Sequence, residues 1–343
     1  MKKLKIDLLV NDGSPIGVVH KDIYGDNGRV GVGGAELALL TLCEAWNEVG
    51  HEVRLYNSPS TPNASPFKQY PIDTFIPREP RDILIIFRSP NHRIEHATGK
   101  KIWFSTDQYT VGSFKKFAKQ VDEIVTISPF HAEHFKSAYG IYNTHVIDLP
   151  VRLGDYEQDV EKIKHRMIFC SVPDRGLNIL AQAYPHIKQE VPDASLVITS
   201  DYRLWGSGAP MNEQFIKRFI NMEGVQFLGA VPRREMVIEQ MKAEVQAYPS
   251  TYDELFCYAV AECSVAGAYP ITSTTGAIAT TNMGTLVGGN PLDPRWASAY
   301  AEEVIKVLRL PELPEMRSKV SLMAKERFSL ERIMKQWDEI FYD

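Results

Sequence analysis

Two successive series of short apolar runs, separated by helical or loop segments, constrain the fold of this chain more than any other feature. The runs of the first series are residues 6–10, 53–56, 83–87, 101–104 and 123–127. The runs of the second series are residues 167–170, 195–199 and 225–228. Strands that alternate with helices are typical of parallel βαβ units. The sequence therefore predicts an α/β fold with two Rossmann-like, doubly wound domains.

The length and composition agree with two domains. With 343 residues and a hydrophobic content of 44%, the chain is long enough to build two cores. We expect an N-terminal domain at residues 1–150 and a C-terminal domain at 151–327. An amphipathic closing helix is expected at residues 328–343.

The charge and the cysteines exclude several classes of protein. A net charge of −5 and a pI near 6.0 argue against a nucleic-acid-binding protein, which usually has a basic face. The four cysteines (Cys43, Cys170, Cys257 and Cys263) lie in apolar segments without metal-type spacing, so we expect reduced core residues. The N-terminal apolar run is too short for a signal peptide, and no run approaches a membrane span. We therefore expect a cytoplasmic protein.

Glu254 and Glu262 are the most informative pair of polar residues. The seven residues between them are apolar except for the hydroxyl of Tyr258. Burying a carboxylate is costly unless hydrogen-bond donors meet it, and a ligand rich in hydroxyls would supply them. A nucleotide sugar has two such ends, the sugar and the ribose. The alternative is that both residues edge an exposed helix stripe.

The two carboxylates can converge only under one condition. On an ideal helix an eight-residue step leaves side chains about 80° apart, so Glu254 must sit at the helix start. Ser250, Thr251 and Asp253 are plausible caps for such a start.

Residues 248–257, with Glu262, the Ala-Gly pair at 266–267 and the loop at 275–277, resemble the donor-site signature of retaining GT-B glycosyltransferases of family 4. The resemblance implies that Glu254 binds hydroxyls of the transferred sugar and that Glu262 binds the ribose. It also implies that the donor contacts Leu255, Phe256 and the backbone of Gly276 and Ala277. The family more often has Gly-Gly at 276–277 and a Glu near position 280 or 281, so the identity of the sugar stays open.

A first candidate phosphate site is the pair Gly33 and Gly34. Glycines at a helix start can present backbone N–H groups and the positive end of the helix dipole to an anion. They could instead belong to a dinucleotide fingerprint, but the full GxGxxG and a ribose-binding acid are missing. A third reading is that they only permit a tight turn into the helix.

A second candidate phosphate site follows the strand expected at residues 167–170. Residues 173–176 have the Pro-Asp-Arg-Gly form found in a subgroup of the family, and the resemblance implies that Arg175 stabilises the leaving diphosphate. Ser171 stands about where the family commonly has a second cationic residue. A guanidinium suits phosphate oxygens. The alternative is an exposed loop arginine paired with Asp174, which would contribute little.

Residues 226–232 match the family's Phe-x-Gly turn. The resemblance implies that backbone groups at Gly229 and Val231 contact the nucleobase. A turn glycine alone would not predict this role.

The acceptor side is expected around Asp107, where related enzymes often place a histidine. This carboxylate could stabilise positive charge at the reacting carbon or orient the acceptor, but it could equally cap the following turn. His131 and His134 lack the spacing of metal ligands, so we expect surface histidines. There is no Asp-x-Asp sequence. We therefore expect transfer without a metal or other cofactor.

A small basic patch offers the one candidate for membrane contact. Lys115, Lys116 and Lys119 lie beside Phe114 and Phe117 and could touch an anionic membrane weakly. A solvated helix face is the alternative.

The resemblance implies a retaining glycosyltransferase that moves a sugar from a UDP- or GDP-linked donor to a hydroxyl of a glycan, glycolipid or small acceptor. It places the donor in the C-terminal domain and the acceptor in the N-terminal domain across a cleft, with the closing helix crossing back. Two alternatives remain, a GT-B sugar-nucleotide epimerase and a nucleotide-sugar-binding protein without catalysis.

Overall fold

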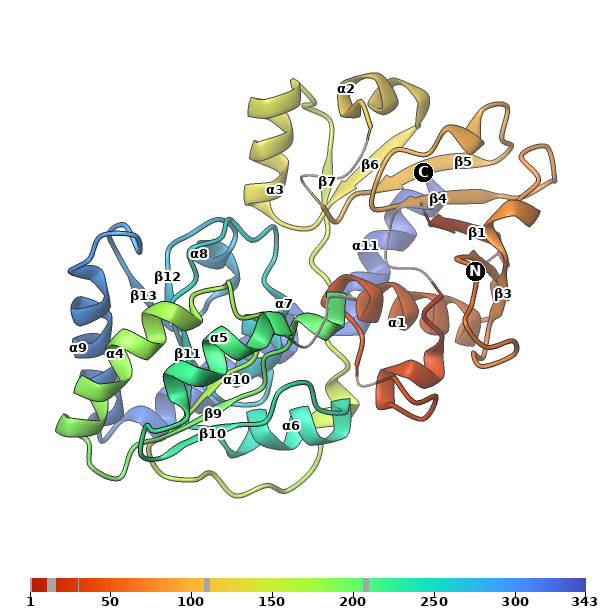
Figure 1. Ribbon diagram of the computed structural model, residues 1–343. Coiled ribbons are helices and arrows are strands. Elements are labelled where there is room, and N and C mark those ends of the chain that lie inside the picture. The colour runs from red at the N-terminus through yellow and green to blue at the C-terminus, as the bar shows by residue number, and fades with distance from the viewer. Residues whose placement is uncertain (1, 11–16, 30, 108–111, 206–209) are drawn as a thin grey trace. The chain divides into compact units, whose positions relative to one another are not determined.

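The computed structural model describes residues 2–10, 17–29, 31–107, 112–205 and 210–343, and the chain divides into two compact units (Figure 1). One unit comprises Met1–Pro150 and Leu330–Asp343, and the other comprises Val151–Ser329.

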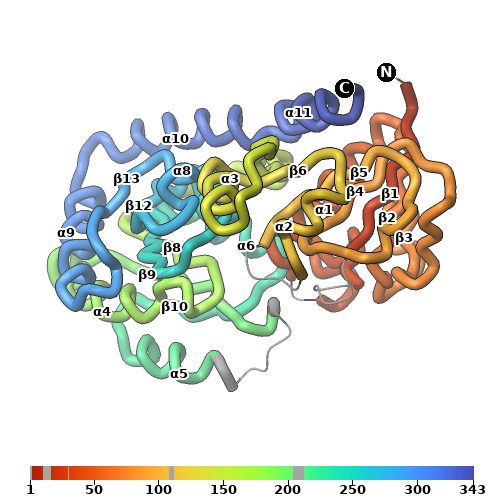
Figure 2. Tube along the Cα trace, turned by 90° about the horizontal axis from the view of Figure 1, so that it is seen from above, coloured from red at the N-terminus to blue at the C-terminus, as the bar shows by residue number. Residues whose placement is uncertain are grey.

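The first unit is built on a parallel sheet in the order β3-β2-β1-β4-β5-β6-β7. Its strands are β1 (Lys5–Val10), β2 (Glu52–Tyr56), β3 (Lys68–Tyr70), β4 (Ile83–Phe87), β5 (Lys100–Phe104), β6 (Glu123–Thr126) and β7 (His145–Val146). Its helices are α1 (Gly34–Glu48), α2 (Phe114–Phe117), α3 (Pro129–His134) and α11 (Leu330–Tyr342). Strands β1, β2 and β3 lie side by side toward one edge of the sheet (Figure 2).

The second unit has a parallel sheet in the order β10-β9-β8-β11-β12-β13. Its strands are β8 (Arg166–Phe169), β9 (Ser195–Ile198), β10 (Val225–Phe227), β11 (Val245–Tyr248), β12 (Tyr269–Ser273) and β13 (Thr285–Val287). Its helices are α4 (Leu177–Glu190), α5 (Pro210–Phe219), α6 (Arg233–Lys242), α7 (Tyr258–Val265), α8 (Ile278–Thr281), α9 (Trp296–Leu308) and α10 (Leu313–Arg327).

Helices cover both faces of the second sheet, and the strand residues show why. Met167 and Phe169 join the core formed with α4 and α9, whereas Ile168 and Cys170 join a smaller core with Cys263 of α7. Successive side chains of a strand point to opposite faces, so a strand that is apolar throughout is buried on both. This arrangement confirms the doubly wound architecture that the sequence predicts.

In both sheets the first strand of the unit lies beside the fourth, β1 beside β4 and β8 beside β11. At this point the strand order reverses direction. Open parallel sheets bind ligands in the crevice outside the carboxyl ends of the two strands that meet there. The segments that follow these four strands are therefore the first places to look for a functional site.

The last helix, α11, packs on the first unit. Trp337 makes an edge-to-face contact with Trp46 of α1, with ring centroids 5.4 Å apart, and a second one with Phe104 of β5 at 5.1 Å. All three side chains are buried. Large aromatic surfaces buried in this way contribute strongly to stability, so α11 is an integral part of this core.

The aromatic side chains of the basic patch also belong to the core. Phe114 and Phe117 are buried and lie edge-to-face against Trp103, with ring centroids at 5.1 and 5.2 Å. They are therefore unavailable to a membrane, whereas Lys115, Lys116 and Lys119 face solvent, as the alternative of a solvated helix face expects. Among the described residues, no helix is both long and apolar enough to cross a membrane.

The cysteines occupy the positions expected of core residues. All four are buried and none is in a disulfide. Burial raises the pKa of the Cys43 thiol well above its usual range, so this side chain is a protonated apolar group.

Candidate functional site

Glu254 lies in the segment that follows β11, at the carboxyl end of the second sheet. The next helix, α7, begins at Tyr258, and its N-cap is Cys257 in the left-handed conformation with φ 68°. Ser250, Thr251 and Asp253 are therefore not caps of this helix, and the condition for convergence of the two carboxylates, Glu254 at a helix start, is not met. Glu254 is positioned by a loop, four residues before the helix.

Arg175 comes from the turn after β8 and meets Glu254 directly. Its Nε donates to Glu254 Oε1 over 3.0 Å, and its Nη1 donates to Asp174 Oδ2 over 3.2 Å. The guanidinium carbon lies 3.4 Å from the ring centroid of Tyr252. Arg175 is only 7% exposed, so it is not the exposed loop arginine of the alternative reading.

The two loops approach closely because of a glycine. Gly176 has φ 105°, and a Cβ at this position would overlap the carbonyl oxygen of Pro249. A side chain is therefore excluded for two reasons, the left-handed backbone and the contact. The turn after β8 and the segment after β11 meet at this glycine.

Tyr248 completes the group around Glu254, and the sequence reading assigned it no role. It is the last residue of β11 and is fully buried. Its hydroxyl donates to Glu254 Oε1 over 3.2 Å and lies 3.2 Å from Ser171 Oγ. The sequence signal that could have identified Tyr248 was its position at the carboxyl end of a strand, where ligands bind in such sheets.

Burial and charge act against each other at this pair. Burial raises the pKa of Glu254, and the nearby Arg175 guanidinium and Tyr248 hydroxyl offset part of that rise. For Arg175, burial alone would lower the pKa, but Glu254 and Asp174 outweigh it and raise the pKa above its usual range. The site thus holds a cation beside a carboxyl that ionises less readily than usual.

A loop after β12 holds the backbone of Glu254. Ala277 N–H donates to the Glu254 carbonyl over 2.7 Å. Gly276 has φ 58°, and a Cβ there would lie 2.7 Å from the Asp253 carbonyl carbon and the Glu254 nitrogen. The structure thus brings three predicted donor-site residues together. The amide of Ala277 is already used within the protein.

Glu262 lies on α7 in a different environment from that of Glu254. It is 7% exposed, accepts from Arg233 Nη1 over 2.6 Å and lies 3.4 Å from Gln240 Nε2. Arg233 Nε also donates to Asp155 Oδ2 over 2.5 Å. The exposed-stripe alternative is therefore wrong for Glu262. Sequence reasoning missed Arg233 and Asp155, which are distant in sequence and carry no motif.

The predicted base-binding turn is anchored by an aspartate that sequence reasoning also missed. Ala230 N–H, between Gly229 and Val231, lies 3.3 Å from Asp201 Oδ2. Burial alone would raise the pKa of Asp201, but hydrogen bonds from Arg203, Asn212 and Ala230 outweigh it and lower the pKa to about 2. Asp201 follows β9, so it joins two loops at the carboxyl end of the sheet.

In the first unit, Asp107 follows β5 and is half-buried. Ser105 Oγ donates to the Asp107 carbonyl oxygen over 3.4 Å. Gly33 is the N-cap of α1, and Gly34 is its first residue. Of the segment between β1 and Gly33, residues 11–16 and 30 lie outside the described residues.

His131 differs from the expectation of a surface residue. It is fully buried, and its Nδ1 accepts from Ile127 N–H over 3.3 Å. Burial, with a smaller contribution from His134, lowers its pKa to about 3. The predicted surface position is therefore wrong for His131. Within the described parts of the chain, no group of three or more His, Cys, Asp or Glu side chains could hold a metal ion.

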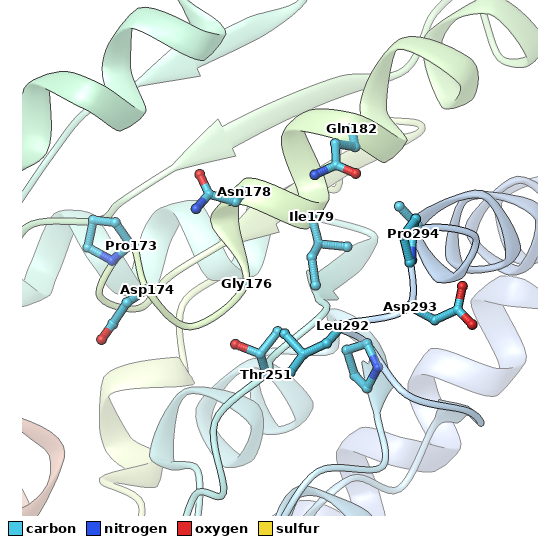
Figure 3. Close-up of a pocket in the computed structure, with 12 residues that line it drawn as sticks. Pro173, Asp174, Gly176, Asn178, Ile179, Gln182, Thr251, Leu292, Asp293 and Pro294 are labelled. Carbon is cyan, nitrogen blue, oxygen red and sulfur yellow. The ribbon is translucent and has the colours of Figure 1, made fainter.

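A cavity of about 450 Å³ borders the turn that carries Arg175 (Figure 3). It lies between the start of α4 and residues 291–294, and its polar groups come from Asp174, Asn178, Gln182, Thr251 and Asp293. Among the described residues no cation lines it, and neither Glu254 nor Glu262 does. Neutral hydroxyl groups therefore suit this cavity better than phosphate does.

Comparisons with known proteins bear on the fold and on the second unit. Residues 167–326 match the family Glycosyl transferases group 1. No curated protein matches the chain.

Solved structures of glycosyltransferases are similar over almost the whole chain. Sucrose-phosphate synthase from Thermosynechococcus elongatus is 15% identical with a TM-score of 0.71, and the match covers 98% of each chain. A glycosyltransferase from Rickettsia africae is 15% identical with a TM-score of 0.69, covering 99% of this chain and 98% of that one. Anabaena HepE in complex with UDP-glucose is 16% identical with a TM-score of 0.69, covering 98% and 99%. These similarities show that the chain has the GT-B fold.

Proposed function

We propose that this protein is a glycosyltransferase that moves a sugar from a nucleoside-diphosphate sugar to a hydroxyl acceptor. The observation that carries the proposal is the Arg175–Glu254 pair, which lies at the carboxyl ends of the adjacent strands β8 and β11. These residues fall within the segment that matches a glycosyltransferase family. A similar structure, Anabaena HepE, holds UDP-glucose.

The arrangement suits a donor with a diphosphate beside a sugar. Arg175 is a buried guanidinium, and bound phosphate oxygens would gain charge-assisted hydrogen bonds from it. Glu254 would then accept from hydroxyls of the transferred sugar. In the structure, Arg175 and Glu254 hydrogen-bond each other. The donor would exchange these contacts for its own, which keeps a buried charge from being left unpaired.

The chemistry follows from these roles. We propose that the acceptor hydroxyl attacks the anomeric carbon from the face that the nucleoside diphosphate leaves. The bond from that carbon to the phosphate oxygen breaks, the bond to the acceptor oxygen forms, and the departing phosphate oxygen takes the acceptor proton. Arg175 would stabilise the negative charge that develops on the diphosphate. Retention of configuration and independence from metal are part of this proposal.

Other predicted donor contacts remain parts of the same proposal. Glu262 would accept from ribose hydroxyls, the Gly229–Val231 turn would contact the base, and Gly33 and Gly34 would contribute backbone amides. Asp107 would lie on the acceptor side. A glycan, glycolipid or small molecule would supply the acceptor hydroxyl.

The test is a transfer assay with a panel of UDP- and GDP-sugars in EDTA, read by release of the nucleoside diphosphate. We expect one donor to be used, at a rate that Glu254→Gln lowers by about a hundredfold or more. Asp253→Asn is the matched control because it removes one carboxylate from the same segment at an exposed position. Full activity of Glu254→Gln would contradict the proposed role.

A further inference from the structure

The cavity of about 450 Å³ beside the turn that carries Arg175 has no role in the proposed function. Its volume lies within the range of roughly 300–1,000 Å³ that is usual for small-molecule sites. The two loops that carry the Arg175–Glu254 pair supply part of its wall, through Asp174 and Gly176 on one loop and Thr251 on the other. A ligand in this cavity would therefore lie next to the proposed donor site without using the two charged groups of the pair.

The two carboxylates that line the cavity already have partners. Asp174 Oδ2 accepts from Arg175 Nη1 over 3.2 Å. Asp293 accepts from Arg295, from Nε over 3.3 Å and from Nη2 over 3.2 Å. Neither arginine lines the cavity. The described lining therefore offers no cation to an anionic ligand, and its carboxylates have little unpaired charge with which to attract a cationic one. These charges favour a neutral ligand.

The remaining polar groups of the lining can each donate and accept. Asn178 and Gln182 lie one turn apart on α4, so they share a face of the helix, and both are exposed. Thr251 lies on the other side of the cavity (Figure 3). Side-chain amides and hydroxyls combine a donor with an acceptor, and so does each hydroxyl group of a ligand. Three such groups on two sides of one cavity suit a ligand that carries several hydroxyls.

The apolar part of the lining is held in place. Figure 3 shows Ile179 of α4 pointing toward Leu292, which is 73% exposed. The turn that carries Leu292 is fixed, because Leu292 N–H donates to Asn290 Oδ1 over 3.0 Å and Asp293 N–H donates to the Asn290 carbonyl over 2.9 Å. An exposed leucine on a fixed turn gains from any ligand that covers it. The C–H groups of a sugar ring supply such a surface beside the hydroxyls.

We propose that this cavity is a binding subsite for a neutral sugar residue. The sugar hydroxyls bond Asn178, Gln182 and Thr251, and its ring C–H groups cover Ile179 and Leu292. The assignment of this sugar to the acceptor glycan, as a residue beyond the one that reacts, rests on the proposed function. A free sugar offers the same chemistry.

The test is an NMR titration of the full-length protein, labelled with ¹³C at the isoleucine and leucine methyl groups. Glu254→Gln is the background, so that a sugar at the proposed donor site contributes little. The probes are glucose, galactose, mannose and N-acetylglucosamine, with the disaccharides maltose, cellobiose and lactose. We expect at least one of them to shift the methyl signals of Ile179 and Leu292 in a saturable way.

The matched variants are two exposed helical glutamines. Gln182→Ala should weaken sugar binding about fivefold through the lost hydrogen bond, and it should keep α4 folded because alanine favours a helix. Gln214→Ala, on α5, should leave the affinity unchanged. Thr251→Val removes a hydroxyl with little change of shape and should cause a loss similar to that of Gln182→Ala.

The proposal is overturned if no sugar of the panel shifts these methyl signals, or if Gln182→Ala and Gln214→Ala bind the sugar equally well. A disaccharide that binds more tightly than its monosaccharide assigns the subsite to a glycan, and equal affinities assign it to a free sugar. None of these results depends on transfer. A protein that binds the sugar but transfers none would contradict the proposed function and keep the subsite, whereas one that transfers without these shifts would keep the function alone.

Discussion

Arg175 Nε donates to Glu254 Oε1 over 3.0 Å, although 79 positions separate the two residues in sequence. The sheet topology brings them together, because β8 and β11 are neighbours and each residue follows one of these strands. Tyr248, at the end of β11, donates to the same carboxylate oxygen. Glu254 Oε1 thus accepts one hydrogen bond from a guanidinium and one from a tyrosine hydroxyl.

The raised pKa of Glu254 predicts that donor binding depends on pH. Burial, the largest cause, makes the folded protein hold this proton more tightly than the unfolded chain does. The donor requires the ionised carboxylate, so its affinity should rise as the pH increases through the raised pKa. We expect binding of the nucleotide sugar to be several-fold weaker near pH 5 than near pH 7.5 in the wild type. Titration calorimetry at the two pH values should find a flat and weak response in Glu254→Gln.

Ionisation of Glu254 also has a consequence for stability. The folded state binds this proton more tightly, so the contribution of Glu254 to stability is greatest at low pH and decreases as the pH rises through the raised pKa.

The donor-binding prediction has a clear contradicting result. A wild-type affinity for the nucleotide sugar that is as high near pH 5 as near pH 7.5 would contradict the requirement for ionised Glu254.

Gly276 should be intolerant of a side chain. Its φ is 58°, and a Cβ would lie 2.7 Å from the backbone at Asp253 and Glu254. Gly276→Ala should cost about 1–3 kcal/mol of unfolding free energy and should weaken donor binding by displacing Glu254. Urea denaturation and calorimetry measure the two effects. Gly288→Ala is the control because its Cβ would meet nothing within 4 Å, and equal losses in both variants would refute the explanation.

The sequence was most informative where a pattern is local. The apolar runs predicted both sheets, and those at residues 6–10 and 83–87 lie within one residue of the strands β1 and β4. The runs did not predict β11, β12 and β13 of the second sheet, nor β3 and β7 of the first, which have only three and two residues. Short strands such as β3 and β7, at the edges of a sheet, carry little apolar periodicity.

The candidate site was only partly predictable. Glu254, Arg175 and Gly276 lie in recognisable segments, and the structure brings them together. The start of α7 was misplaced because the N-cap, Cys257, is not a residue type that usually caps helices.

The partners of Glu262 could not be predicted from the sequence. Its ion-pair partner Arg233 lies 29 positions away and meets it through the packing of α6 and α7. Asp155, which accepts from the same guanidinium, lies farther away still, before β8. The burial of His131 was also missed, because an isolated histidine in a first helical turn resembles a surface residue.

Arg233 should be important for stability. It is 7% exposed and bonds both Glu262 and Asp155. Arg233→Gln would leave two carboxylates without their cation, and removing one partner of a buried ion pair costs about 3–5 kcal/mol. Urea denaturation should show this loss, whereas Arg234→Gln, at the exposed neighbouring position, should change stability by less than about 0.5 kcal/mol. Equal stability of the two variants would mean that Arg233 has no such role.

His131 should make the protein acid-sensitive. Its pKa is lowered to about 3 by burial, so between that value and the usual histidine pKa the unfolded chain binds a proton that the folded chain does not. Its stabilising contribution is complete above the unfolded pKa and decreases as the pH falls, by up to about 1.4 kcal/mol per pH unit. Denaturation near pH 7 and near pH 5 should therefore show a smaller loss in His131→Gln than in the wild type. The exposed His92→Gln should behave like the wild type, and a wild-type slope in His131→Gln would contradict the explanation.

The most direct test of the donor site is titration calorimetry of UDP, GDP, ADP and dTDP in EDTA, with wild type and Arg175→Gln. We predict that one diphosphate binds without added metal and that Arg175→Gln weakens it about tenfold or more. Arg309→Gln, which removes an exposed arginine from the same unit, should leave the affinity unchanged. If no diphosphate binds, or if Arg175→Gln binds it as tightly as the wild type, then the Arg175–Glu254 pair is not the donor site.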